Sequence, residues 1–177
     1  MVNILCIDPG IINLAFSYLY ISDEELKIIF YKKIDITYYS KSISDAIDKF
    51  CKEYKNIIEL SYKIIIEKQP PTGAALVVQE LLYSKLKNRI IYLNPKTVSA
   101  YFGTSKLTYE KRKKRNVEIA NEFFKIKETS YDICDSLCLS IYYKENMSDS
   151  LDIKERFKEY TFKKQNPFDK YAYCRKK

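Results

Sequence analysis

The hydrophobic pattern of the chain changes its period partway along, and this change constrains the fold more than any other feature. Three short runs rich in β-branched and aromatic residues come first, separated by polar turns, which predicts an antiparallel meander of strands. The runs are Val2 to Ile7, Asn13 to Ile21 and Leu26 to Ile34. From Ser42 onward, helical spacing alternates with further short apolar runs. Strands that alternate with helices favour parallel pairing, so we expect a sheet of mixed direction.

The second stretch of the chain is expected to supply two more strands and the helices. Apolar residues recur every three or four positions from Ser42 to Leu60, with Ser42 or Ser44 as the helix cap. Strands are predicted at 62–67 and 89–93, helices at 74–86, 111–124 and 131–143, and a helical turn at 94–101. The order β-β-β-α-β-α-β-α-α predicts an α/β domain with a mixed five-stranded sheet, in which three antiparallel strands are followed by parallel strands, and with helices on both faces.

The length of 177 residues suits one domain, which we expect over residues 1–146. Beyond it the chain becomes strongly charged, and we expect residues 147–177 to form a peripheral helix, as far as Tyr160, and a basic tail. The apolar start has no basic leader and stops at Asp8, so we interpret it as a strand and not as a secretion signal. Apolar runs stay short of the roughly 18 residues that span a membrane, so no membrane association is expected.

The chain has no histidine, which excludes several kinds of catalysis. Ser-His and Cys-His nucleophiles and a histidine base are ruled out, so carboxylates, lysines or hydroxyls must carry the chemistry. The five cysteines are odd in number and contain no C-x-x-C pair. That usage is typical of a reduced cytosolic or nuclear protein, and neither a zinc site nor a small-molecule cofactor is expected.

Four acidic residues occupy positions that the predicted fold would bring together. Asp8 ends the first strand, Glu67 ends the fourth, and Asp132 and Asp135 lie three apart at the start of the last helix. Neighbouring parallel strands end at the same edge of a sheet, and residues three apart share one face of a helix. An oxygen-only ligand set favours Mg²⁺ or Mn²⁺, and two such ions can hydrolyse a phosphodiester without a histidine. We therefore expect these four residues to hold two metal ions.

Each of these acids taken alone also has a structural interpretation. The aspartate of an Asp-Pro-Gly turn often serves its own side-chain hydrogen bond, and a glutamate at a strand end often faces solvent. Acidic residues in a first helical turn interact favourably with the helix dipole. The joint placement of all four residues is what favours the metal site.

The segments that carry these acids resemble, in order and spacing, the RuvC-like Holliday junction resolvases of the RNase H-like superfamily. They are Ile4-Leu5-Cys6-Ile7-Asp8-Pro9-Gly10, Ile64-Ile65-Ile66-Glu67-Lys68-Gln69 and Asp132-Ile133-Cys134-Asp135-Ser136-Leu137. The compact form rich in tyrosine and lysine resembles the poxvirus branch, and the resemblance runs from Val2 to about Tyr143.

The resemblance implies an RNase H-like fold with Asp8, Glu67, Asp132 and Asp135 as metal ligands. It also implies a homodimeric, metal-dependent endonuclease that nicks two opposed strands of a four-way DNA junction symmetrically and leaves 5′-phosphates. Such an enzyme would act in viral DNA recombination and in resolving concatemers during genome replication, in the cytoplasm of the host cell.

Basic residues predict where DNA is bound. The net charge of +8 suits a polyanionic partner, and the densest run is Lys111-Arg112-Lys113-Lys114-Arg115. The resemblance matches Lys114 to a catalytic lysine of the family. It also matches Ser99 to a lysine of the bacterial members, so we assign that phosphate contact to Lys96. The predicted DNA-binding residues are Lys96, Lys106, Lys111, Arg112, Lys113, Lys114, Arg115 and Gln69. A solvated helix face or a nuclear-import signal is the alternative for the run.

Other functions remain open at this stage. A less selective nuclease of the same fold would cut flaps or RNA:DNA hybrids, and a non-catalytic member would bind nucleic acid without a working metal site. The presence of all four acids counts against the second alternative. A structural protein that is merely basic leaves the arrangement of the acids unexplained.

Overall fold

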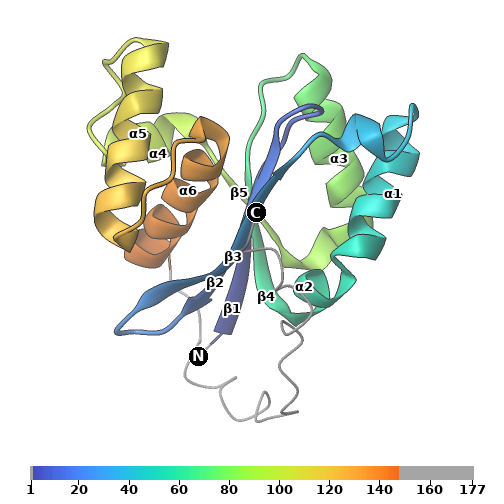
Figure 1. Ribbon diagram of the computed structural model, residues 1–177, viewed down its shortest axis with the longest axis horizontal. Helices are drawn as coiled ribbons and strands as arrows, with labels where there is room; N and C mark the ends of the chain where they lie inside the picture. The colour runs from blue at the N-terminus through green and yellow to red at the C-terminus, as the bar shows by residue number, and fades with distance from the viewer. Residues whose placement is uncertain (1, 148–177) are drawn as a thin grey trace.

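The computed structural model describes residues 2–147 and forms three layers, with a twisted sheet between two groups of helices (Figure 1). The strands are β1 (Val2–Asp8), β2 (Leu14–Ile21), β3 (Leu26–Ile34), β4 (Ser61–Glu67) and β5 (Ile90–Leu93). Their order across the sheet is β3-β2-β1-β4-β5. Strands β1 to β3 pair antiparallel, whereas β4 pairs parallel with both β1 and β5. The mixed five-stranded sheet expected from the sequence is confirmed.

Helices cover both faces of the sheet, as expected. The α-helices are α1 (Ile43–Glu53), α2 (Lys55–Leu60), α3 (Ala74–Leu86), α4 (Pro95–Tyr101), α5 (Tyr109–Phe124) and α6 (Tyr131–Met147), and the short 3-10 turns are η1 (Ile36–Tyr38) and η2 (Lys87–Arg89). Helices α1 to α3 lie on one side of the sheet and α4 to α6 on the other (Figure 1). Met147 belongs to α6, and the peripheral helix and basic tail expected after it lie outside the described residues.

The single helix predicted from Ser42 to Leu60 is wrong, because the structure divides it at Tyr54 into α1 and α2. Ser42 does cap the first helix, with its side chain accepting a hydrogen bond from the N–H of Asp45. The Tyr54 ring is buried and its centroid lies 4.7 Å from that of Phe16 on β2. The packing of this ring against the sheet therefore accompanies the interruption of the helix.

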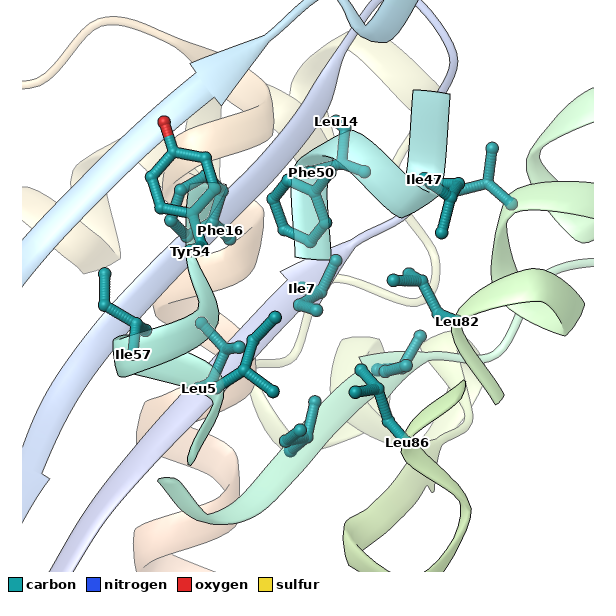
Figure 2. Packing of buried hydrophobic residues seen from close by; sticks show 14 of the residues in the cluster. Leu5, Ile7, Leu14, Phe16, Ile47, Phe50, Tyr54, Ile57, Leu82 and Leu86 are labelled. Carbon is teal, nitrogen blue, oxygen red and sulfur yellow. The ribbon is translucent and has the colours of Figure 1, made fainter. Parts of the chain in front are cut away.

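An aromatic and aliphatic core fills the space between the sheet and helices α1 to α3 (Figure 2). Phe16 is at its centre, with ring centroids 5.5 Å from Phe50 and 5.8 Å from Phe30. Leu5 and Ile7 of β1 reach the same layer. This side of the sheet is devoted to packing.

A second core lies between the opposite face of the sheet and α6. Every residue of α6 from Ile133 to Ile141 is buried. Ile4 and Cys6 of β1 and Ile65 of β4 face this layer. Within residues 2–147, none of the helices combines the length and apolar character needed to cross a membrane. The second core places the first turns of α6 over the ends of β1 and β4.

Candidate functional site

The strand register places residues from four strands in one row across the sheet. Asp8 pairs with Ala15, and Ala15 pairs with Lys33. On the other side of β1, Ile7 pairs with Ile66, so Asp8 lies beside Glu67. Side chains alternate between the faces of a strand, and Asp8 therefore shares the face of Cys6, and Glu67 that of Ile65. Both carboxylates belong to the face that α6 covers.

The turn after Asp8 leaves little room for a side chain at Gly10. A Cβ placed there would lie 3.1 Å from the carbonyl carbon and oxygen of Asn13, so the backbone of Asn13 would have to move by a few tenths of an ångström. Glycine suits this close approach of the chain, which follows the last residue of the strand, Asp8.

Glu67 is held by a chain of two glutamines. The Gln69 side chain donates to the Glu67 carboxylate over 3.3 Å and to its backbone carbonyl over 3.2 Å. The backbone N–H of Gln69 donates to the Gln79 side-chain oxygen at 2.7 Å, and Gln79 is buried on α3. Gln69, which the sequence assigned to DNA binding, thus orients a carboxylate in this structure.

The loop before α6 is fixed by side-chain hydrogen bonds. The side chain of Asn121 on α5 accepts a hydrogen bond from the backbone N–H of Glu128 at 2.8 Å and donates one to its carbonyl at 2.9 Å. The Glu128 carboxylate accepts from the backbone N–H groups of Thr129 and Ser130 at 2.8 Å. These bonds fix the start of α6 relative to α5, and with it the position of Asp132.

Two lysines from different elements contact the acids of α6. Lys113 on α5 forms a short ion pair with Asp135, and its ammonium lies 3.9 Å from one oxygen of Asp132. Lys33 on β3 binds the other oxygen of Asp132 at 3.3 Å. The amide of Asn116 donates to the second oxygen of Asp135 at 2.8 Å. Both acids of α6 therefore have cationic partners.

The electrostatics link the strand acids to the helix acids. Burial raises the pKa of Asp8 well above its usual value, and the negative charges of Glu67, Asp135 and Asp132 raise it further. Burial also raises the pKa of Glu67, as does the charge of Asp135. Lys113 lowers both pKa values. The charges of the other three acids thus act on Asp8, a hydrogen bond with Asp8 lowers the pKa of Glu67, and Lys113 offsets part of the repulsion.

The carboxylate oxygens of these four acids suit a hard divalent cation, although their side chains do not converge on one point in this structure. Within the described part of the chain, no three acids or cysteines converge closely enough to hold an ion as they lie. Lys113 and Asn116 each bind one oxygen of Asp135. Oxygen-only ligands suit Mg²⁺ or Mn²⁺, and a cation would relieve the repulsion that raises the pKa of Asp8. A cation that used both oxygens of Asp135 would compete with Lys113 and Asn116 for them.

The structure distinguishes Lys113 from its neighbour Lys114. Lys113 retains 12% exposure of its side chain beside the acids, whereas Lys114 is exposed. Burial lowers the pKa of the Lys113 ammonium, but the charge and hydrogen bond of Asp135 outweigh this effect and the pKa is raised. Lys113 lies four residues before Val117, which packs into the second core, so helical spacing could have identified it.

The other predicted DNA-binding residues lie mostly on the surface. Arg112 is half-buried, and the exposed side chains are those of Lys96, Lys106, Lys111, Lys114 and Arg115. Arg115 forms an ion pair with Glu118 at 2.8 Å. Two residues of the site, Lys33 and Asn116, were missed from the sequence. Asn116 shares a helix face with Lys113, which helical spacing could have indicated, whereas the register that sets Lys33 in line with Asp8 is not visible in the sequence.

Comparison with known proteins places this arrangement in context. The family model described as poxvirus A22 protein matches residues 2–150. No curated protein sequence matches the chain. The crystal structure of the fowlpox virus resolvase with substrate Holliday junction DNA is similar with a TM-score of 0.63 and 21% identity, over 81% of this chain and 97% of that one. Thermus thermophilus RuvC is similar with a TM-score of 0.59 and 12% identity, over 81% and 95% of the two chains.

Proposed function

This chain belongs to the family of poxvirus A22 proteins, the poxvirus branch of the RuvC-like Holliday junction resolvases, and from that premise we propose how it acts. It is an endonuclease whose substrate is the four-way DNA junction. The observation that carries this proposal is the row that sets Asp8 beside Glu67, with Asp132 and Asp135 of α6 close enough to raise the pKa of Asp8.

RuvC-like resolvases generally depend on divalent metal ions. Here Asp8, Glu67, Asp132 and Asp135 would hold two Mg²⁺ or Mn²⁺ ions. Such ions supply an activated water and stabilise the leaving oxygen of a phosphodiester. Gln69 and Asn116 keep the carboxylates of Glu67 and Asp135 oriented toward the shared space. The chain itself therefore contributes the ligands and their alignment.

Lys113 takes the catalytic role that the resemblance gave to Lys114. Its ammonium already lies among the acids and neutralises part of their charge. With metal ions bound to the acids, the Lys113 ammonium would be available to contact the phosphate that is cut. The exposed lysines of α4, α5 and the loop between them, among them Lys96, Lys106, Lys111 and Lys114, would bind the phosphate backbone on either side.

The remaining expectations rest on the family. We propose a homodimer, because symmetric nicks in opposed strands require two active sites. We place its action in viral DNA recombination and concatemer resolution. The host cytoplasm is the proposed location, and the four described cysteines are free thiols that suit a reducing compartment.

A cleavage assay with four labelled substrates tests the function. The protein is incubated with a four-way junction, a flap, a linear duplex and an RNA:DNA hybrid, with Mg²⁺ or with EDTA. We expect paired nicks in the junction with Mg²⁺ alone. The Asp135→Asn variant should bind the junction without cutting it, whereas Asp23→Asn, at an exposed turn, should cut like the wild type.

The same assay separates the alternatives. Equal cutting of flap, duplex or hybrid would assign the chain to a less selective nuclease. Junction binding without cutting by the wild type would indicate a non-catalytic binding protein. Retained cutting by Asp135→Asn would remove the proposed metal site.

A further inference from the structure

Lys33 is a cation of the site that neither the basic run nor the acidic motifs include. It lies at the end of β3, in the row that passes through Ala15 to Asp8. Its ammonium binds Asp132 at 3.3 Å, and 40% of its side chain is exposed. Asp132 is therefore contacted by a lysine from the sheet and by a lysine from α5.

The pairing of Lys33 with Asp132 is poorly explained by stability alone. Ion pairs as exposed as this one contribute little to folding, because water screens them and holding the side chains costs entropy. Lys113, in contrast, is largely enclosed and satisfies the more buried Asp135. The exposed part of the Lys33 side chain is thus accessible to a binding partner from solution.

The position of Lys33 suits a DNA phosphate. A phosphate group held near Asp132 would lie close to the Lys33 ammonium, which is 3.3 Å from that carboxylate. A cation bound to Asp132 would weaken the attraction between that carboxylate and Lys33. The positive charge of Lys33 would then be available to a DNA phosphate. The opposite charges of the lysine and the backbone then favour direct contact.

We propose that Lys33 binds the DNA backbone next to the phosphate that is cut, on the opposite side of the acids from α5. This inference rests on the proposed function, since it takes junction DNA as the ligand. Lys33 is a positioning residue in this scheme, because it holds the backbone while the acids serve the reacting phosphate.

Lys32 offers a matched control, because it is the next residue and carries the same charge on the other face of the sheet. Its ammonium donates a hydrogen bond to the Tyr54 hydroxyl at 3.0 Å, beside the aromatic core. Lys33→Met and Lys32→Met therefore remove equal charge from adjacent positions. Lys33→Arg keeps the charge at the site.

The test measures binding of each variant to a labelled four-way junction by fluorescence anisotropy, with Ca²⁺, between about 0.05 and 0.3 M salt. Loss of one phosphate contact should reduce the slope of log affinity against log salt by about 0.9, which weakens binding about fivefold at 0.15 M salt. We expect this for Lys33→Met, an unchanged slope for Lys32→Met, and a slope close to wild type for Lys33→Arg. Thermal melting and denaturing gels show that each variant is folded and each junction intact.

The outcomes separate this inference from the proposed function. A wild-type slope for Lys33→Met, or an equal loss in Lys32→Met, would overturn the contact while leaving the nuclease untouched. A wild type that neither binds nor cuts the junction in Mg²⁺ would overturn both.

Discussion

Replacing Lys113 with methionine should strengthen metal binding while it abolishes efficient cleavage. Lys113 forms a short ion pair with Asp135 and lies 3.9 Å from Asp132, so a metal ion that uses these acids has to displace it. Methionine keeps the length and most of the apolar contact of the side chain but carries no charge. The variant thus removes a resident competitor from the site.

The size of the effect follows from the bond that is lost. A hydrogen bond to a charged group contributes about 1.5 to 3 kcal/mol, and the enclosed position of Lys113, with 12% exposure, argues against a smaller value. A metal ion that no longer has to break this bond should bind about tenfold to about 100-fold more tightly, since about 1.4 kcal/mol corresponds to a factor of ten. Cleavage should fall because the variant lacks the ammonium that we propose contacts the phosphate that is cut.

Titration calorimetry with Mn²⁺ measures this affinity without any DNA. The titration belongs at pH 8 or higher, because Lys113 also lowers the pKa of Asp8 and its removal favours protonation of the ligands at lower pH. Lys114→Met, which removes the same charge from an exposed neighbour, is the control and should change the affinity by less than about twofold. Equal affinities in wild type and Lys113→Met, or equal gains in the two variants, would refute displacement of Lys113.

Three further predictions concern the supporting structure. Phe16→Ala should lower the free energy of unfolding by about 3 to 5 kcal/mol, measured by urea denaturation, because the ring is fully buried among three aromatic neighbours. Gln79→Leu should lower the free energy of unfolding by about 1 to 3 kcal/mol in the same measurement, since the N–H of Gln69 loses its acceptor. The same variant should slow cleavage more than it weakens junction binding. Burial raises the pKa of Asp8 and Glu67, so the folded metal-free protein retains protons that the unfolded chain releases above about pH 4. The free energy of unfolding should therefore fall as the pH rises from about 4 through the raised pKa values. Thermal melting in EDTA should record this fall, and Asp8→Asn should flatten it; a flat profile in the wild type would contradict the burial of these acids.

The strands and the placement of the acids at strand ends could be predicted because both depend on local pattern. Runs rich in β-branched and aromatic residues identified the three meander strands, and the expected proximity of Asp8 and Glu67 required in addition the parallel pairing of β1 with β4. The helical spacing of Asp132 and Asp135 placed both on one face. These features follow from periods of two and three to four residues, which a sequence displays directly.

The lysines depended on packing that the sequence does not display. The pairing of β2 with β3 shifts register between Tyr18 and Leu19, and a slip of one residue would exchange Lys32 and Lys33 between the two faces. The basic run on α5 carries charge at every position from Lys111 to Arg115, so the face that meets α6 has to be found from the apolar residues that follow. The break at Tyr54 likewise accompanies the packing of its ring against a strand distant in the sequence.

The sheet separates the chemistry of this protein from its main aromatic packing. Asp8 and Glu67 belong to the face beneath α6, while the rings around Phe16 lie on the reverse (Figure 2). Substitutions on the exposed face of α5 should therefore leave the aromatic layer intact, because that helix lies on the other side of the sheet (Figure 1).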